Sequence, residues 1–156
     1  MRISDMLDES MIFFDVPGKN KEELIVHLVE KMGEASKEIK NTKKFIQEVL
    51  EREALGSTGI GDEVAIPHAR TENVNRILMA FARTKEPIDF EAEDALPVRL
   101  VFLMGVPIKE LKSYLTALAR LSRVIKIKKV RNVLLQATSP KELIEIIKMA
   151  EDGLVA

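Results

Sequence analysis

The chain has 156 residues, enough for one domain with a sizeable core, and 24 basic and 25 acidic side chains give a net charge of −1. This balance excludes an overall field that would attract nucleic acid or an anionic membrane. Cysteine is absent, which excludes disulfides, thiol catalysis and thiolate metal sites, and two histidines make a poor zinc site. We therefore expect a single domain over residues 1–156 that binds no metal.

The first part of the chain predicts one strand and two helices. The apolar run MIFFDV at residues 11–16, closed by Pro17-Gly18, is typical of a strand followed by a turn. An Asn-x-x-Glu start at residues 20–23 and apolar residues at helical spacing predict a helix that ends near Gly33. A second helix is expected at about residues 42–54, where one face carries Phe45, Ile46, Val49 and Leu50.

Two central strands follow. The nearly continuous apolar runs ILMAFAR (77–83) and VRLVFLMGV (98–106) favour strands that are covered on both faces. Residues 64–66 predict a brief extended piece before Pro67, and residues 86–90 predict a loop or an edge piece between the two long runs.

The last third of the chain predicts three helices. One carries a stripe at positions 111, 115, 118 and 122, and another begins near Val130. The third starts at Ser139-Pro140-Lys141-Glu142, a Ser cap with Pro at the first position and Glu at the third, and Gly153 follows it. The order of elements predicts an α/β fold: a three-layer α/β/α sandwich with a mixed central sheet flanked by helices.

The segment GSTGIGDEVAIPHAR at residues 56–70 leads to His68, one of two histidines in the chain. Histidine can act as a general base, a metal ligand or a phosphoryl acceptor. Gly59 and Gly61 have no Cβ, so backbone N–H groups there can come close to an anion. Pro67 restricts the backbone in front of His68 and would hold the ring in a defined direction.

Two arginines extend this candidate site. Arg70 follows His68 by two residues, and Arg52 lies at the end of the second predicted helix. Their guanidinium groups suit a developing phosphoryl charge, so one interpretation of the segment is a phosphate-handling site centred on His68. A purely structural interpretation stays open at this point: turn glycines, a structural proline and an exposed histidine.

Other nucleotide and hydrolase motifs are missing. The glycines lack the third small residue of a dinucleotide fingerprint, and the chain contains neither a Walker GxxxxGK[ST] motif nor a GxSxG elbow. The second histidine, His27, lies in the first predicted helix beside Leu24 and Leu28, where we expect a structural role.

The pattern RxxxGSTGIGxxxAIPHAR, from Arg52 to Arg70, resembles the signature of the enzyme IIA domains of the sugar phosphotransferase system (PTS), fructose/mannitol class. That class includes the nitrogen-regulatory enzyme IIA proteins. The similarity covers nearly the whole chain, in its length, its strand-helix-helix opening, its central motif and its helical last third.

The resemblance implies a phosphocarrier that needs no cofactor. Such a protein takes a phosphoryl group from the small carrier HPr onto the histidine that matches His68, and passes it to a cysteine of an enzyme IIB partner. Arg52 matches the arginine that balances charge on the transferring group, and Gly59 and Gly61 match the adjoining loop. The resemblance also implies the alternative of a signalling protein whose phosphorylation state controls partner binding.

One residue departs from the pattern. Many members carry a second histidine near the active one, at the start of a C-terminal helix, and the matching residue here is Tyr114, the only tyrosine in the chain. Its hydroxyl can donate one hydrogen bond to a phosphoryl oxygen, but it does not titrate near neutral pH as an imidazole does. This departure leaves a third alternative open, a binding module that has lost transfer.

The remaining expectations concern location and partners. The N-terminal sequence lacks a continuous apolar block, and no apolar run reaches the length of a membrane span, so we expect a cytoplasmic protein that does not insert into membranes or bind nucleic acid. The apolar helical faces are compatible with a homodimer. The basic run RVIKIKKVR (123–131) predicts a solvated face between two helices or a partner-docking patch.

Overall fold

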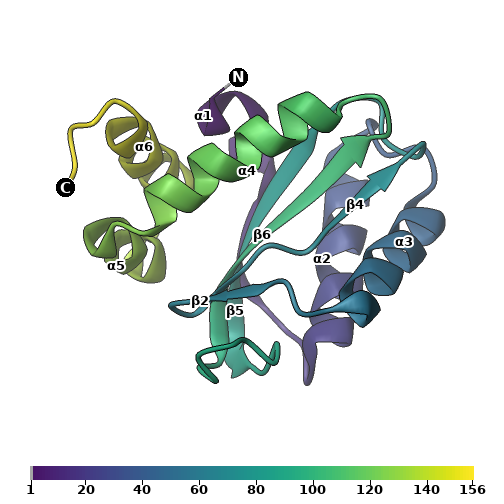
Figure 1. Cartoon of the computed structure of the whole chain (residues 1–156), viewed down its shortest axis with the longest axis horizontal. Helices are drawn as coiled ribbons and strands as arrows, with labels where there is room; N and C mark the ends of the chain where they lie inside the picture. The colour runs from purple at the N-terminus through teal and green to yellow at the C-terminus, as the bar shows by residue number, and fades with distance from the viewer. Residues whose placement is uncertain (1) are drawn as a thin grey trace.

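Figure 1 shows the computed structural model, which describes residues 2–156. The strands form one mixed sheet in the order β1-β5-β6-β3-β2, and β4 also pairs with β6. The β1–β5, β3–β6 and β4–β6 pairs are parallel, whereas β2–β3 and β5–β6 are antiparallel. The strands span β1 Ile12–Val16, β2 Gly59–Gly61, β3 Val64–Ala65, β4 His68–Thr71, β5 Leu78–Ile88 and β6 Val98–Pro107.

Helices cover both faces of this sheet (Figure 1). One face packs against α2 (Lys21–Ala35) and α3 (Thr42–Leu55), and the other packs against the short N-terminal helix and the three C-terminal helices. The second group is α1 (Ile3–Met6), α4 (Leu111–Ile125), α5 (Lys128–Gln136) and α6 (Pro140–Glu151), with a 3₁₀ turn η1 at Glu9–Met11 before β1. The predicted three-layer α/β/α sandwich with a mixed sheet is therefore confirmed.

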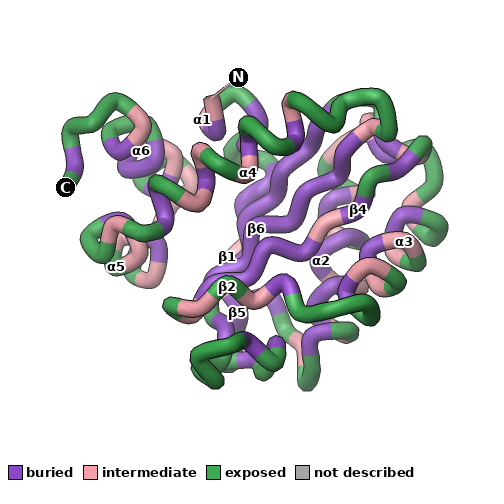
Figure 2. Tube along the Cα trace, viewed as in Figure 1, coloured by how far each residue is buried: buried purple, intermediate pink, exposed green. Residues whose placement is uncertain are grey.

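The core lies on the two faces of the long strands, which Figure 2 shows buried along most of their length. Side chains alternate between faces along β6: Phe102 and Met104 pack with α4 and α6, while Val101 and Leu103 pack with α2 and α3. On the first of these faces, the rings of Phe81 and Phe102 meet edge to face at a centroid distance of 5.2 Å. Burial on both faces explains the continuous apolar runs of these strands.

The predicted helix starts are confirmed by their caps. The side chain of Asn20 accepts a hydrogen bond from the backbone N–H of Glu23 at 2.8 Å, and Ser139 accepts one from Glu142 at 3.2 Å. The first of these helices continues two residues past Gly33. A Cβ at Gly33 would lie 2.6 Å from the Thr42 hydroxyl, so the missing side chain lets α2 and α3 pack closely.

The structure corrects the prediction for residues 86–90. Strand β5 runs on through Glu86 and Pro87 to Ile88, with an irregular register between Arg83 and Ile88 against β6. The irregularity accommodates Pro87, which has no N–H to donate to a ladder. None of the helices among residues 2–156 is long and apolar enough to cross a membrane.

Candidate functional site

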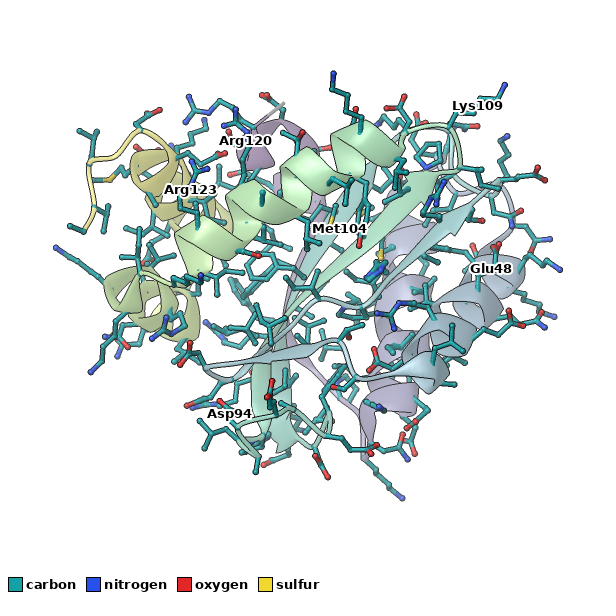
Figure 3. All side chains as sticks on the ribbon, in the orientation of Figure 1. Glu48, Asp94, Met104, Lys109, Arg120 and Arg123 are labelled. Atoms are coloured by element: carbon teal, nitrogen blue, oxygen red, sulfur yellow. The ribbon has the colours of Figure 1, made fainter. Side chains whose placement is uncertain are left out.

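His68 is the first residue of β4, at a point where the edge of the sheet is built from two short strands. Strands β3 and β4 pair in succession with β6, and the register is continuous across Pro67: Ala65 pairs with Val101 and His68 with Met104. The Pro67 carbonyl accepts a hydrogen bond from the Met104 N–H at 3.0 Å, and Figure 3 labels Met104 on β6. Pro67 thus keeps the backbone in register while fixing where His68 emerges.

The hydrogen bonds of the His68 ring define its tautomer. Its Nδ1 lies 3.0 Å from the Ile66 carbonyl oxygen, and a carbonyl only accepts, so Nδ1 carries the proton. Nε2 therefore presents its lone pair, and the Tyr114 hydroxyl donates to it at 3.1 Å. Burial lowers the pKa of His68 below its ordinary 6.5, the Ile66 bond opposes this, and the Arg52 charge lowers the pKa further. The neutral form of the ring is therefore favoured at physiological pH.

Tyr114 belongs to the buried stripe of α4. It is 8% exposed, and its ring centroid lies 5.3 Å from that of His68. Burial raises the pKa of Tyr114, against the opposing charges of Arg52 and Arg70, so the hydroxyl stays protonated at neutral pH. The core stripe of α4 is Tyr114, Ala117, Leu121, Val124 and Ile125, and the predicted stripe at positions 111, 115, 118 and 122 flanks it.

Arg52 and Arg70 approach His68 from two elements. Arg52 lies in the last turn of α3, where its Nη1 donates to the Gly56 carbonyl at 2.9 Å. Arg70 shares a face of β4 with His68, and its Nη2 donates to the Ile108 carbonyl at 2.9 Å. A guanidinium has five N–H donors, so each of these arginines retains donors for an anion.

His68 and Arg52 separate two adjoining pockets. The larger, of about 580 Å³, is lined by Glu48, Glu51, Arg52, Leu55, His68, Ala69 and Arg70. The smaller, of about 290 Å³, is lined by Arg52, Ser57, Thr58, Ile60, Ile66, His68, Tyr114, Leu118 and Ser122. The structure thus brings together four predicted site residues: His68, Arg52, Arg70 and Tyr114.

The glycines of the motif serve the hairpin of β2 and β3. A Cβ on Gly59 would lie 2.9 Å from the Ala92 side chain, and Gly61 has a φ of +88° next to the turn. The backbone N–H of Asp62 in this turn donates to Asp94, which Figure 3 labels. Neither glycine lines the two pockets, so close packing and turn geometry account for both, and their approach to an anion stays a prediction.

A buried ion pair lies behind the site, and sequence reasoning missed it. Glu53, 3% exposed, accepts from Lys21 Nζ at 3.3 Å and from the Thr58 backbone N–H at 2.9 Å, and its other oxygen accepts from the Thr58 hydroxyl. Lys21 also pairs with Glu91 at 3.4 Å. Burial, the largest influence on the pKa of Lys21, lowers it, but both carboxylates together outweigh burial and raise the pKa.

Helix α3 is fastened to β4 on its other side. Glu48, labelled on α3 in Figure 3, accepts from the Thr71 hydroxyl and from Asn73 Nδ2, the latter at 2.8 Å. Together with Glu53, five residues further on, this carboxylate fixes the C-terminal half of α3. Arg52 is therefore held on a rigid helix next to the strand that carries His68.

Two other features of the sequence lie away from this site. His27 Nδ1 is 2.8 Å from the Pro17 carbonyl oxygen, a local contact in keeping with a structural role. The basic run at 123–131 spans the end of α4 and the start of α5, and its exposed members are Arg123, Lys126, Lys128 and Lys129. Within residues 2–156, no three His, Asp or Glu side chains are grouped to hold a metal ion.

Comparison with known proteins identifies the family. The family described as "Phosphoenolpyruvate-dependent sugar phosphotransferase system, EIIA 2" matches residues 5–150. The chain is 35% identical over 147 residues to the PTS system fructose-specific EIIABC component of Bacillus subtilis, covering 94% of this chain but 23% of that protein. It is 33% identical to the PTS system fructose-specific EIIA component of Haloferax volcanii, covering 93% and 94% of the two chains.

Solved structures agree with this match. The nitrogen regulatory protein IIA-Ntr from Neisseria meningitidis superimposes with a TM-score of 0.85 and 32% identity, covering 93% of this chain and 98% of that one. The complex of enzyme IIAMTL and phosphorylated enzyme IIBMTL from Escherichia coli has a similar fold, with a TM-score of 0.75, 23% identity and coverage of 91% and 98%. The chain belongs to the EIIA 2 family of the phosphoenolpyruvate-dependent sugar phosphotransferase system.

Proposed function

We propose that the protein is a phosphocarrier that accepts a phosphoryl group from an HPr-type donor on Nε2 of His68 and passes it to a cysteine of an enzyme IIB partner. The observation that carries this proposal is the fixed tautomer of His68. Because Nδ1 donates to Ile66 O, the nucleophilic lone pair is on Nε2, next to Arg52. The family match and the likeness to a IIA–IIB complex support the same chemistry.

In the first transfer, the Nε2 lone pair attacks the phosphorus of the donor's phosphohistidine. The new P–N bond forms as the donor's P–N bond breaks, and the donor imidazole leaves with that electron pair. The phosphorylated His68 ring keeps its proton on Nδ1, where the Ile66 carbonyl accepts it. In the second transfer, an acceptor thiolate attacks the phosphorus and the electron pair returns to Nε2. Positioning and electrostatics supply the catalysis.

The two arginines and Tyr114 have separate roles in this proposal. Arg52, which lines both pockets, and Arg70, which lines the larger one, offer guanidinium donors to the equatorial oxygens of the transferring group. The Tyr114 hydroxyl, which donates to Nε2 before transfer, donates to a phosphoryl oxygen afterwards. This gives Tyr114 the hydrogen-bonding part of the family's second histidine without its titration near neutral pH.

Exposed apolar side chains around His68 favour a protein as the reaction partner. Leu55 and Ile60 each line one of the two pockets, and Leu115 projects from the same helix as Tyr114. Their exposed fractions are 86%, 50% and 54%. Apolar side chains that converge on a reactive atom are typical of a docking site for another protein. The proposal places the protein in the cytoplasm with its donor.

A nitrogen-regulatory role is the second candidate. The likeness to IIA-Ntr of Neisseria meningitidis supports it, and the chemistry at His68 would be the same. The two candidates differ in the acceptor. Phosphorylated protein mixed with enzyme IIB of the fructose or mannitol system separates them, with transfer to the IIB cysteine followed by intact mass. Loss of the phosphoryl group to IIB supports transport, and retention with the group still acid-labile supports signalling.

A further inference from the structure

A series of hydrogen bonds, joined through Thr58 and Ile66, connects Lys21 at the start of α2 to the imidazole of His68. Lys21 Nζ donates to Glu53 at 3.3 Å, and Glu53 accepts from the Thr58 N–H at 2.9 Å. The Thr58 carbonyl accepts from the Ile66 N–H at 2.9 Å, and the Ile66 carbonyl accepts from His68 Nδ1 at 3.0 Å. Each link is within ordinary hydrogen-bond distance.

Glu53 is the only carboxylate in this series of hydrogen bonds, and both of its oxygens accept hydrogen bonds. Its side chain is 2% exposed, and its two oxygens accept from Lys21 Nζ, the Thr58 N–H and the Thr58 hydroxyl. Burying a carboxylate carries a large desolvation penalty that only such partners offset. Because two of these three donors belong to Thr58, the Glu53 carboxylate fixes the position of Thr58 relative to α3.

We propose that Glu53, held in place by Lys21, is a positioning residue for phosphoryl transfer, fixing through Thr58 and Ile66 the tautomer and direction of the His68 ring. This inference rests on the proposed function. Glu53 follows Arg52 in α3, so one helical turn sets the position of the arginine directly and that of the histidine through the loop. The two groups that must flank the phosphorus are thereby fixed to the same turn.

Lys21 is the counter-charge that lets Glu53 stay ionised while buried. Its side chain is 10% exposed, and it pairs with Glu53 and Glu91. Removing Glu53 alone would leave the Lys21 charge with one exposed partner and Thr58 with unpaired donors, which destabilises the fold. Replacing both Lys21 and Glu53 by methionine also leaves the Thr58 donors unpaired, but it removes the two charges together at similar volume and leaves no uncompensated buried charge, so it preserves the fold better.

The test therefore compares Lys21→Met/Glu53→Met with Glu53→Gln and with Glu30→Met, a matched control at an exposed carboxylate of α2. Single-turnover transfer from phosphorylated HPr gives the rate and the KM. Imidazole ¹⁵N shifts of histidine-labelled protein give the tautomer of His68. His27, whose Nδ1 bonds to Pro17, is an internal reference in the same spectrum.

We expect the double methionine variant to fold, to keep its KM within about threefold and to transfer about 10- to 100-fold more slowly, as expected for a nucleophile displaced by up to 1 Å. Its His68 shifts should show a mixture of tautomers. The Glu53→Gln variant should keep a transfer rate within about threefold of the wild-type rate, because the amide oxygen still accepts from the Thr58 N–H. Glu30→Met should match the wild type.

Wild-type shifts and rate in the folded double variant would overturn the inference. If the double variant unfolds, Glu53→Asp replaces it: the charge is kept but the carboxylate is withdrawn from Thr58. Slow transfer with mixed tautomers supports the inference there, and an unchanged rate and tautomer reject it. If the wild-type protein takes no phosphoryl group, the proposed function fails. The imidazole ¹⁵N shifts then still show whether Glu53 fixes the tautomer of the His68 ring.

Discussion

The hydroxyl of Tyr114 lies 3.1 Å from Nε2 of His68 and donates to the lone pair that attacks phosphorus in the proposed transfer. The nucleophile is therefore occupied before transfer. For the reaction to proceed, the O–H must rotate away from Nε2 and find a new acceptor, and an incoming phosphoryl oxygen supplies one. Tyr114 thus exchanges one hydrogen bond for a stronger one with an anion as the group arrives.

Tyr114→Phe should slow transfer onto His68 about 5- to 30-fold, since the lost bond to a charged oxygen exceeds the lost neutral bond to Nε2 by about 1–2 kcal/mol. Affinity for the donor should change little. Single-turnover assays over a range of phosphorylated HPr concentrations give the transfer rate and the affinity for the donor. A Tyr114→Phe variant that transfers faster than the wild type would show that the hydroxyl acts only by masking Nε2.

Arg52→Ala should lower the transfer rate about 100- to 1000-fold, the range measured when one donor to a transition-state charge is removed. Donor binding should persist, because the exposed apolar side chains of Leu55 and Ile60 beside the pockets remain available to the donor. Titration calorimetry with unphosphorylated HPr, set beside the rate assay, separates the two effects. Full activity of Arg52→Ala would remove Arg52 from the mechanism.

The sequence predicted which residues meet at the candidate site better than it predicted the strands that hold them. Motif residues His68, Arg52 and Arg70 meet as expected, because the spacing of the motif carries their relation. The strands β2 and β4 were missed, since GIG and HART have neither length nor apolar alternation. Strand β4 forms because β6 offers its edge, and a local pattern cannot report that distant partner; β2 pairs with its hairpin neighbour β3.

Tyr114 illustrates a second limit. The leucines at 111 and 115 belong to the predicted apolar stripe of α4, yet they are exposed and flank the core stripe that contains Tyr114. Which stripe of a helix faces the core depends on the sheet it packs against, and the sequence of the helix alone does not show this. The Lys21–Glu53 ion pair could not be predicted from the sequence either, because 32 residues separate its two members.

The transfer rate should depend on pH through His68. Burial holds the pKa of His68 below 6.5, so the neutral nucleophile should predominate throughout the neutral range and the rate should fall only at more acidic pH. Rates measured from pH 5 to 8 check this. A rate that still rises between pH 7 and 8 would contradict the lowered pKa.

The same shift has a consequence for stability. Because the folded-state pKa of His68 lies below the ordinary 6.5, the unfolded chain binds the proton more readily, so this contribution to stability is present above pH 6.5 and is lost as the pH falls through the folded value. Thermal unfolding of His68→Ala and wild-type protein over this range should converge as the pH falls. Parallel curves would show that His68 has no such linkage.

Leu55→Asp should weaken donor binding about tenfold or more with little effect on the fold, because the side chain is 86% exposed and lines the larger pocket beside His68. Leu154→Asp is the matched control, an exposed leucine near the C-terminus, 70% exposed, that lines neither pocket beside His68. Binding of both variants to HPr, measured by calorimetry, decides the point. Equal affinities would place the docking surface elsewhere.

The most direct test of the central claim is phosphorylation of the purified protein by phosphoenolpyruvate, enzyme I and HPr, followed by intact mass. We predict the gain of one phosphoryl group that is lost in acid and that His68→Ala abolishes while remaining folded, because His68 lies at a pocket rather than in the core. A folded wild-type protein that gains no phosphoryl group, or a His68→Ala variant that still gains one, would contradict the account.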